Sequence, residues 1–229
     1  MITQYRYRLR SDGGAPLPCH CAYRLYSGLL ARLPEEYGSA LHQCRSTPVS
    51  QFLYIQRETG ECIWVVNLLN REAEAYFTPV LTPTLCLELP RERVTGKLQV
   101  CLRFEDARDF LGRVPKNSLN LTFPVPTAFK QAGHYVALPQ EKLLLQSMQS
   151  KWNETFPETP ITRELGLTLD SFLLHSSCFR LKGRPIPGFC GSLTLSAPRG
   201  DQQELEALAA FARFGGIGIK TALGMGGVL

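Results

Sequence analysis

Residues 215–227 read GGIGIKTALGMGG and hold six glycines among thirteen residues. Glycine adopts positive φ at little cost, so such a run can form tight turns whose backbone N–H groups converge on an anion, with Lys220 adding a positive charge. The alternative is a series of turns that closes a domain. The candidate anion-binding residues are Gly216, Gly218, Lys220, Thr221, Gly224 and Gly226.

The pair Lys220-Thr221 also occurs in nucleotide-binding P-loops, but its surroundings here differ from theirs. A P-loop has Gly directly before the Lys and lies between a strand and a helix. Here Ile219 precedes Lys220, and a helical pattern precedes the whole run. We therefore exclude nucleotide hydrolysis.

Upstream of the run, the second half of the chain predicts alternating strands and helices. One helix follows Asp201, which with Glu204 has the pattern of a capping box. Apolar residues at helical spacing predict another helix at 140–152. Strands are predicted at 119–123, 167–181 and 188–196.

The first half predicts the same kind of order. Residues 2–9 alternate between a face with Tyr5 and Tyr7 and a face with Arg6 and Arg8, which is typical of a strand with a basic exposed side. Helices are predicted at 22–33 and 35–42, and from the capping residue Asn70 to 77. Strands are predicted at 49–56, 61–68, 85–89 and 96–104, and a short helix at 105–111. This order of β, α, β, β, α, β is the ferredoxin-like arrangement.

A Pro-containing turn at 112–117 is a plausible boundary between the halves. We therefore predict an α+β protein of two tandem ferredoxin-like (RRM-like) domains, 1–114 and 115–229, each an antiparallel sheet with helices on one face.

Composition supports a globular protein with a basic character. The 229 residues carry a net charge of +5, and Arg outnumbers Lys by 18 to 7. Guanidinium groups grip phosphate in a bidentate manner, so this excess suits a nucleic-acid binder, although a solvated basic face fits the charge equally well. No apolar stretch reaches the roughly 20 residues of a membrane span, and the N-terminal residues lack a signal pattern, so we expect a cytoplasmic protein with no membrane partner.

The eight cysteines do not predict a metal centre. No C-x-x-C pair occurs, and the neighbouring side chains of Cys19, His20 and Cys21 point in divergent directions on a regular backbone. Cys86 and Cys101 lie in apolar runs, where we expect small buried hydrophobic residues. We predict neither a metal nor a cofactor.

Five short motifs can be compared with known families: GGIGIKTALGMGGV at 215–228, PGFCG at 187–191, PTAFK at 126–130, LP at 138–139 and KWN at 151–153. Together they resemble the motifs of the CRISPR repeat-processing endoribonucleases of the RAMP superfamily. The resemblance implies tandem ferredoxin-like domains and, as substrate, the repeat of a CRISPR precursor transcript. It also implies metal-independent cleavage, in which the 2′-OH attacks the adjacent phosphate and leaves a 2′,3′-cyclic phosphate and a 5′-OH.

Such a reaction needs a base for the 2′-OH and an acid for the leaving oxygen, and histidine suits both transfers. By resemblance His42 is the first candidate, because it ends the helical segment in which the family places its catalytic histidine. The alternative for His42 is a helix-end residue that only contacts carbonyl groups. His20, in the loop before the first helix, is the second candidate; we expect His134 to lie in a hairpin and His175 to be structural.

The resemblance also implies a tyrosine on the first helix and a lysine shortly after the histidine. Tyr26 matches the tyrosine, although its place on the apolar stripe predicts burial equally well. The lysine is absent, and Arg45 is the nearest cation. An arginine can stabilise a phosphorane but cannot give up a proton at neutral pH.

For RNA binding, the resemblance adds Lys182 and Arg184 to the glycine-rich run, and Arg6, Arg8 and Arg10 form a second basic strip. Each of these residues could equally be an exposed charge without a partner. The alternative to an enzyme is a non-catalytic RAMP-type subunit that holds guide RNA in a CRISPR interference complex. Other CRISPR-associated proteins and a second copy of the chain are further possible partners.

Overall fold

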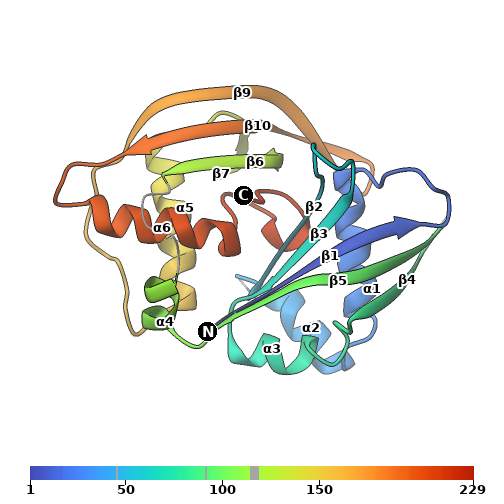
Figure 1. Ribbon diagram of the computed structural model, residues 1–229. Coiled ribbons are helices and arrows are strands. Elements are labelled where there is room, and N and C mark those ends of the chain that lie inside the picture. The colour runs from blue at the N-terminus through green and yellow to red at the C-terminus, as the bar shows by residue number, and fades with distance from the viewer. Residues whose placement is uncertain (45, 91, 114–118) are drawn as a thin grey trace.

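The computed structural model describes residues 1–44, 46–90, 92–113 and 119–229. Its two larger antiparallel sheets lie side by side, each with helices on one face, and the C-terminal segment lies between them (Figure 1). This arrangement confirms the predicted α+β class. In the described part of the chain, no helix combines the length and the apolar character needed to cross a bilayer.

The first sheet has the ferredoxin-like order with one added strand. Its strands are ordered β2-β3-β1-β5-β4. They span Ile2–Ser11 (β1), Val49–Ile55 (β2), Cys62–Leu68 (β3), Thr84–Leu89 (β4) and Glu92–Phe104 (β5). Helices α1 (Ala22–Leu30), α2 (Glu35–Gln43) and α3 (Arg71–Phe77) cover one face, and a short 3-10 turn, η1 (Cys19–Cys21), precedes α1.

Local signals explain these elements. The alternation in β1 buries Tyr5, Tyr7 and Leu9 in the core beneath the helices. The N-cap of α3 is formed as predicted, because the Asn70 side chain accepts a hydrogen bond from the Ala73 N–H.

The second sheet repeats the plan with three strands in the order β6-β10-β9. These span Asn120–Thr127 (β6), Thr168–Leu181 (β9) and Arg184–Ser196 (β10), with helices α5 (Glu141–Thr155) and α6 (Gln202–Gly215) on one face. A small hairpin joins β7 (Phe129–Gln131) to β8 (His134–Val136), which confirms His134 as a hairpin residue. The glycine-rich run follows α6 and contains a short 3-10 turn, η2 (Thr221–Leu223).

The C-terminal residues occupy the place of a fourth strand in the second sheet. The N–H of Leu229 donates to the carbonyl of Thr122 at 2.9 Å, and the N–H of Gly226 donates to the carbonyl of Pro126 at 3.1 Å. This segment therefore pairs with the free edge of β6, where the ferredoxin-like plan requires a strand.

Helix α4 (Ala107–Arg113) follows β5 but packs on the second half of the chain. The ring of Phe110 lies edge-on to Trp152, Phe211 and Phe214, at centroid distances of 6.0, 6.3 and 5.6 Å. The predicted boundary between 114 and 115 lies outside the described residues.

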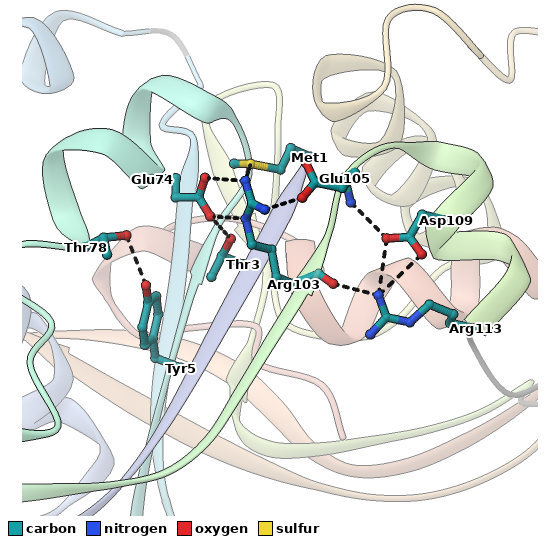
Figure 2. Close-up of polar contacts among 9 residues, drawn as sticks. All are labelled: Met1, Thr3, Tyr5, Glu74, Thr78, Arg103, Glu105, Asp109 and Arg113. Atoms are coloured by element: carbon teal, nitrogen blue, oxygen red, sulfur yellow. Dashed lines mark hydrogen bonds and ion pairs between the residues drawn. The ribbon is translucent and has the colours of Figure 1, made fainter.

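Polar contacts fix α4 and α3 to the end of β5 (Figure 2). The Nε of Arg103 donates to the Glu74 carboxylate at 2.6 Å, and Arg103 also pairs with Glu105. Arg113 of α4 donates to the carbonyl of Arg103 at 2.8 Å. Most of these side chains are exposed, so the contacts orient the helices more than they stabilise the fold.

Two local sequence predictions need correction. The capping box is not formed: Asp201 precedes α6, but its carboxylate accepts from the Gly166 N–H and from Arg163 instead. Cys86 and Cys101 are exposed, because they lie on the outward face of β4 and β5. All eight cysteines are free.

Strand β6 runs four residues beyond its predicted end, through two prolines. The pairing of β6 with β10 passes from Phe123↔Gly191 to Thr127↔Phe189 with a shift in register. Because the ladder skips the residues between, Pro124 and Pro126 need not donate hydrogen bonds.

Candidate functional site

A cavity of about 930 Å³ lies where the two halves meet. Its walls come from α1, α2, the start of α3, α5, the β9–β10 turn and the glycine-rich run. The polar residues that line it are Tyr23, Ser27, Tyr26, Tyr37, Ser46, Thr47, Asn70, Glu72, Lys151, Glu154, Thr155, Lys182, Lys220 and Thr221.

Buried hydrogen bonds across the interface hold these walls in place. Gln51, on β2, donates to the carbonyls of Ala22 at 3.2 Å and Ala222 at 3.1 Å, and accepts from the Trp64 indole at 2.7 Å. Ser50, the neighbouring residue on β2, donates to the carbonyl of Phe214 at the end of α6. These contacts place the glycine-rich run against β2 and α1 of the first half.

Helix α2 contains His42 and contributes Tyr37, Ala40 and Leu41 to the cavity wall. His42 is next to last in this helix, which runs one residue beyond the predicted range of 35–42. Its side chain lies outside the described part of the structure, and so does Arg45. The segment that follows the helix borders the same cavity through Cys44, Ser46, Thr47 and Pro48.

Tyr26 is both buried and part of the cavity wall. Its side chain is 4% exposed and its ring stacks on Phe77 at 6.3 Å. Burial, helped by the neighbouring Tyr37, raises the pKa of the Tyr26 hydroxyl above its ordinary value. The phenol is therefore neutral at pH 7, and it can donate a hydrogen bond but cannot serve as a base.

Tyr37, on α2, was not singled out from the sequence. Its ring stacks on Tyr76 at 3.9 Å, and burial raises the pKa of its hydroxyl to about 12. The hydroxyl oxygen is buried without a hydrogen-bond partner among the described residues. Since Tyr37 follows Pro34 at the start of a helix, only its helical spacing to Leu41 indicated that it faces inward.

The glycine-rich run is folded back on the protein. The N–H groups of Gly216, Gly218 and Gly226 donate to Ala212 O, Ser147 Oγ and Pro126 O at 2.8, 2.8 and 3.1 Å. The prediction that these N–H groups converge on an anion is therefore wrong for these three glycines, because internal acceptors already use them.

Close packing explains why glycine is needed there. A Cβ on Gly218 would lie 2.2 Å from Ala128 O, and one on Gly226 would lie 2.0 Å from Ile217 O. A Cβ on Gly224 would lie 2.5 Å from the Cβ of Ala22, in the first half of the chain. The run thus brings its backbone close to both halves.

Lys220 and Lys182 both bring positive charge to the cavity wall. Both have left-handed backbone conformations, with φ of 56° and 50°, in the glycine-rich run and in the β9–β10 turn. Thr221 lies beside Lys220, whereas Arg184 is exposed at the start of β10 and does not line the cavity. The structure thus brings together three of the four non-glycine binding candidates.

Lys151 is a third lysine in the cavity wall, and the sequence did not single it out as a site residue. Its Nζ lies 3.2 Å from Gly215 O, 3.1 Å from Gly216 O and 3.3 Å from Thr221 Oγ1. Burial lowers the pKa of Lys151 to about 7, and Glu154 opposes this shift. The one signal for it was its place in the KWN motif.

The other histidines lie elsewhere. His20 is in η1 but is not among the residues that line the cavity, and burial together with Arg24 and Arg180 lowers its pKa. His134 is exposed in the β7–β8 hairpin, and His175 is exposed on β9 rather than packed inside the sheet.

The basic strip on β1 is partly neutralised. Arg8 forms an ion pair with Glu61 at 2.7 Å, and the Nε of Arg6 donates to the Gln4 side chain at 2.8 Å. Arg8 and Arg10 border a separate hollow of about 310 Å³ rather than the large cavity. Within residues 1–44, 46–90, 92–113 and 119–229, no three His, Cys, Asp or Glu side chains gather to hold a metal ion.

Comparison with known proteins places this geometry in a family. A family model described as CRISPR-associated endoribonuclease Cas6 matches residues 121–228. The CRISPR-associated endoribonuclease Cas6 of Mycobacterium tuberculosis is 30% identical over 220 residues, which cover 89% of this chain and 69% of that protein. The protein of the same name from Streptococcus thermophilus is 28% identical, with 90% of each chain covered.

Solved structures agree in fold. A Cas6 product complex has a TM-score of 0.78 at 24% identity, with 100% of both chains covered. Thermus thermophilus Cas6 has a TM-score of 0.73 at 24% identity, with 100% of this chain and 98% of the other covered. The chain therefore belongs to the family of CRISPR-associated endoribonucleases Cas6.

Proposed function

We propose that the chain is an endoribonuclease that cleaves CRISPR precursor transcripts within the repeat. The 2′-OH of one nucleotide attacks the adjacent phosphate, the bond to the 5′ oxygen breaks, and the products carry a 2′,3′-cyclic phosphate and a 5′-OH. No metal takes part in the proposed reaction. The observation that supports this most is the interdomain cavity, which joins the helix of His42 to lysines from three other segments.

In this proposal, His42 transfers the proton as general acid or base, and Tyr26 donates a hydrogen bond to a phosphate oxygen. The neutral state of the buried Tyr26 phenol supports the second role. Arg45 stabilises the charge that builds on the phosphorane. Each role is assigned by family resemblance together with the cavity described above.

RNA phosphates are bound in this proposal by Lys220, Thr221 and Lys182 in the cavity, and by Arg184 outside it. The four glycines of the candidate set, Gly216, Gly218, Gly224 and Gly226, shape the loop that carries Lys220. The volume of this cavity, about 930 Å³, lies within the range of about 300–1,000 Å³ that is typical of ligand-binding sites.

The test is cleavage of a CRISPR repeat RNA in EDTA, with wild type compared with His42→Ala. We expect His42→Ala to slow cleavage by about 10²-fold or more, which is the usual contribution of a general acid or base. A substrate with 2′-deoxyribose at the scissile position should not be cut. His134→Ala, in the exposed hairpin, is the matched control and should cleave at the wild-type rate.

Other outcomes redirect the proposal. Cleavage that persists in His42→Ala but fails in His20→Ala would move the site to His20. Tight binding of the repeat RNA without cutting would favour the non-catalytic RAMP-type subunit, in line with the missing lysine after His42. Cleavage abolished by EDTA would exclude the metal-independent mechanism.

A further inference from the structure

Lys151 lies on α5 at the point where this helix meets the glycine-rich run. Its Nζ contacts Gly215 O, Gly216 O and Thr221 Oγ1 within 3.3 Å. The lysine nitrogen donates hydrogen bonds in its charged and in its neutral form, and three oxygens surround it here. The side chain thus reaches the run at two places, its start and the residue that follows Lys220.

The start of the run is a favourable place for a hydrogen-bond donor. Gly215 ends α6, and Gly216 is its C-cap with a φ of 68°. The last carbonyl groups of a helix lack partners inside the helix and carry a partial negative charge. Without Lys151, the carbonyls of two buried glycines would lose a donor.

One face of α5 holds two sides of the cavity together. One turn before Lys151, Ser147 accepts the Gly218 N–H at 2.8 Å. In the last turn of the helix, Glu154 accepts a hydrogen bond from Ser46, in the segment that follows the helix of His42. Lys151 therefore lies between the contact to the loop and the contact to the His42 side.

We propose that Lys151 is a positioning residue for RNA in the interdomain cavity: it binds the glycine-rich loop and so sets the position of Lys220. This inference rests on the proposed function. Lys220 itself has a left-handed backbone and lies directly before Thr221, so a shift of Thr221 moves the Lys220 side chain with it. Lys151 acts through Lys220 and does not need to touch the RNA.

The test is a double-mutant cycle on RNA affinity, with Lys151→Met, Lys220→Met and the double variant. Lys151→Met keeps the length of the side chain and removes the donors. We expect each single variant to weaken binding of a CRISPR repeat RNA about tenfold, as for the loss of a hydrogen-bonded charge. Because Lys151 acts through Lys220, the double variant should bind scarcely more weakly than Lys220→Met.

Effects that multiply to about a hundredfold in the double variant would show that the two lysines act independently, and would overturn the proposal. Unchanged RNA affinity in Lys151→Met would overturn it as well. A wild-type protein that does not bind the repeat RNA would instead contradict the proposed function, so the two failures can be told apart.

Thr221→Val, alone and combined with Lys220→Met, tests the same proposal if Lys151→Met does not fold. Thr221→Val removes one of the three acceptors of Lys151 and leaves both lysines in place. It should weaken RNA binding about threefold more in the wild-type background than in Lys220→Met, where only the proposed phosphate contact of Thr221 is left to lose. An equal loss of affinity in both backgrounds would contradict the positioning role.

Discussion

The first domain places a continuous strand of 13 residues, β5, beside β1, whereas the second places the end of the glycine-rich segment beside β6. Strand β5 pairs with nearly the whole length of β1 and stays within its own sheet. The C-terminal segment makes only a few such hydrogen bonds, and its earlier part leaves the sheet. That part contacts β2 and α1 of the other domain.

This difference shows how one repeated plan produces a single site. A regular fourth strand in the second domain would complete the sheet but could not turn toward the first domain. The irregular segment forms fewer hydrogen bonds with β6 than a strand would, and its earlier part forms one wall of the cavity. Its glycines are needed because the backbone passes close to other atoms on several sides.

The largest effect is expected where this segment is most crowded. Gly226→Ala would place a Cβ 2.0 Å from Ile217 O and should lower the free energy of unfolding by about 4 kcal/mol. Gly60→Ala is the matched control, because Gly60 has nearly the same φ but open space around it. It should cost only about 1 kcal/mol in chemical unfolding. Equal losses would mean that φ alone, and not close packing, requires glycine in the run.

The second largest loss of stability is expected at the contact between the domains. Gln51→Leu leaves the buried indole N–H of Trp64 without its acceptor and two carbonyls without their donor. We expect a loss of about 3 kcal/mol in the free energy of unfolding. Gln99→Leu, on the exposed part of β5, is the control and should change it by less than about 0.5 kcal/mol. A small effect of Gln51→Leu would show that apolar packing alone holds the domains together.

Lys151 should make stability depend on pH. Its pKa is lowered to about 7 in the native state, so above pH 7 the native protein binds fewer protons than the unfolded chain. The free energy of unfolding therefore rises with pH from about 7 to 10, by up to about 1.4 kcal/mol per pH unit.

Lys151→Met should remove this rise, as measured by urea unfolding at pH 7 and pH 9. Both proteins keep the other titratable groups of the cavity wall, so the difference between them reports Lys151. Those groups are Tyr23, Tyr26, Tyr37, Cys44, Glu72, Glu154, Lys182 and Lys220. Parallel pH dependence in the two proteins would contradict the lowered pKa.

The smallest effect has the opposite sign. Tyr37→Phe removes a buried hydroxyl that has no partner among the described residues, so it should stabilise the protein by about 1 kcal/mol. Tyr5→Phe is the control, because the Tyr5 hydroxyl lies 3.0 Å from Thr78 Oγ1, and it should destabilise by a similar amount. Destabilisation by Tyr37→Phe would mean that its hydroxyl is hydrogen-bonded in solution.

Local patterns were enough to predict most of the fold. The alternation in β1 and the side chain of Asn70 act within a few residues, so the sequence reports them directly. The path of β6 through Pro124 and Pro126 depends on a register shift against β10, which no local pattern reports. For the same reason the predicted cap at Asp201 failed: its carboxylate has better partners in Gly166 and Arg163.

The candidate site was predictable only in part. Lys220, Thr221 and Lys182 could be chosen from the glycine-rich run and from family resemblance, and all three line the cavity. Composition shows that glycines allow unusual φ values, but it does not show which atoms surround them. Tyr37 and Lys151 depend on contacts between segments far apart in the sequence, so only the folded structure brings them together.

The place of the C-terminal segment also has a consequence for protein synthesis. Domains form in order as a chain leaves the ribosome, and residues 215–229 follow every strand and helix that they join. Both sheets can therefore assemble while the cavity still lacks one wall. Completion of the site therefore waits for the synthesis of residues 215–229, and a nascent chain without them has no assembled cavity.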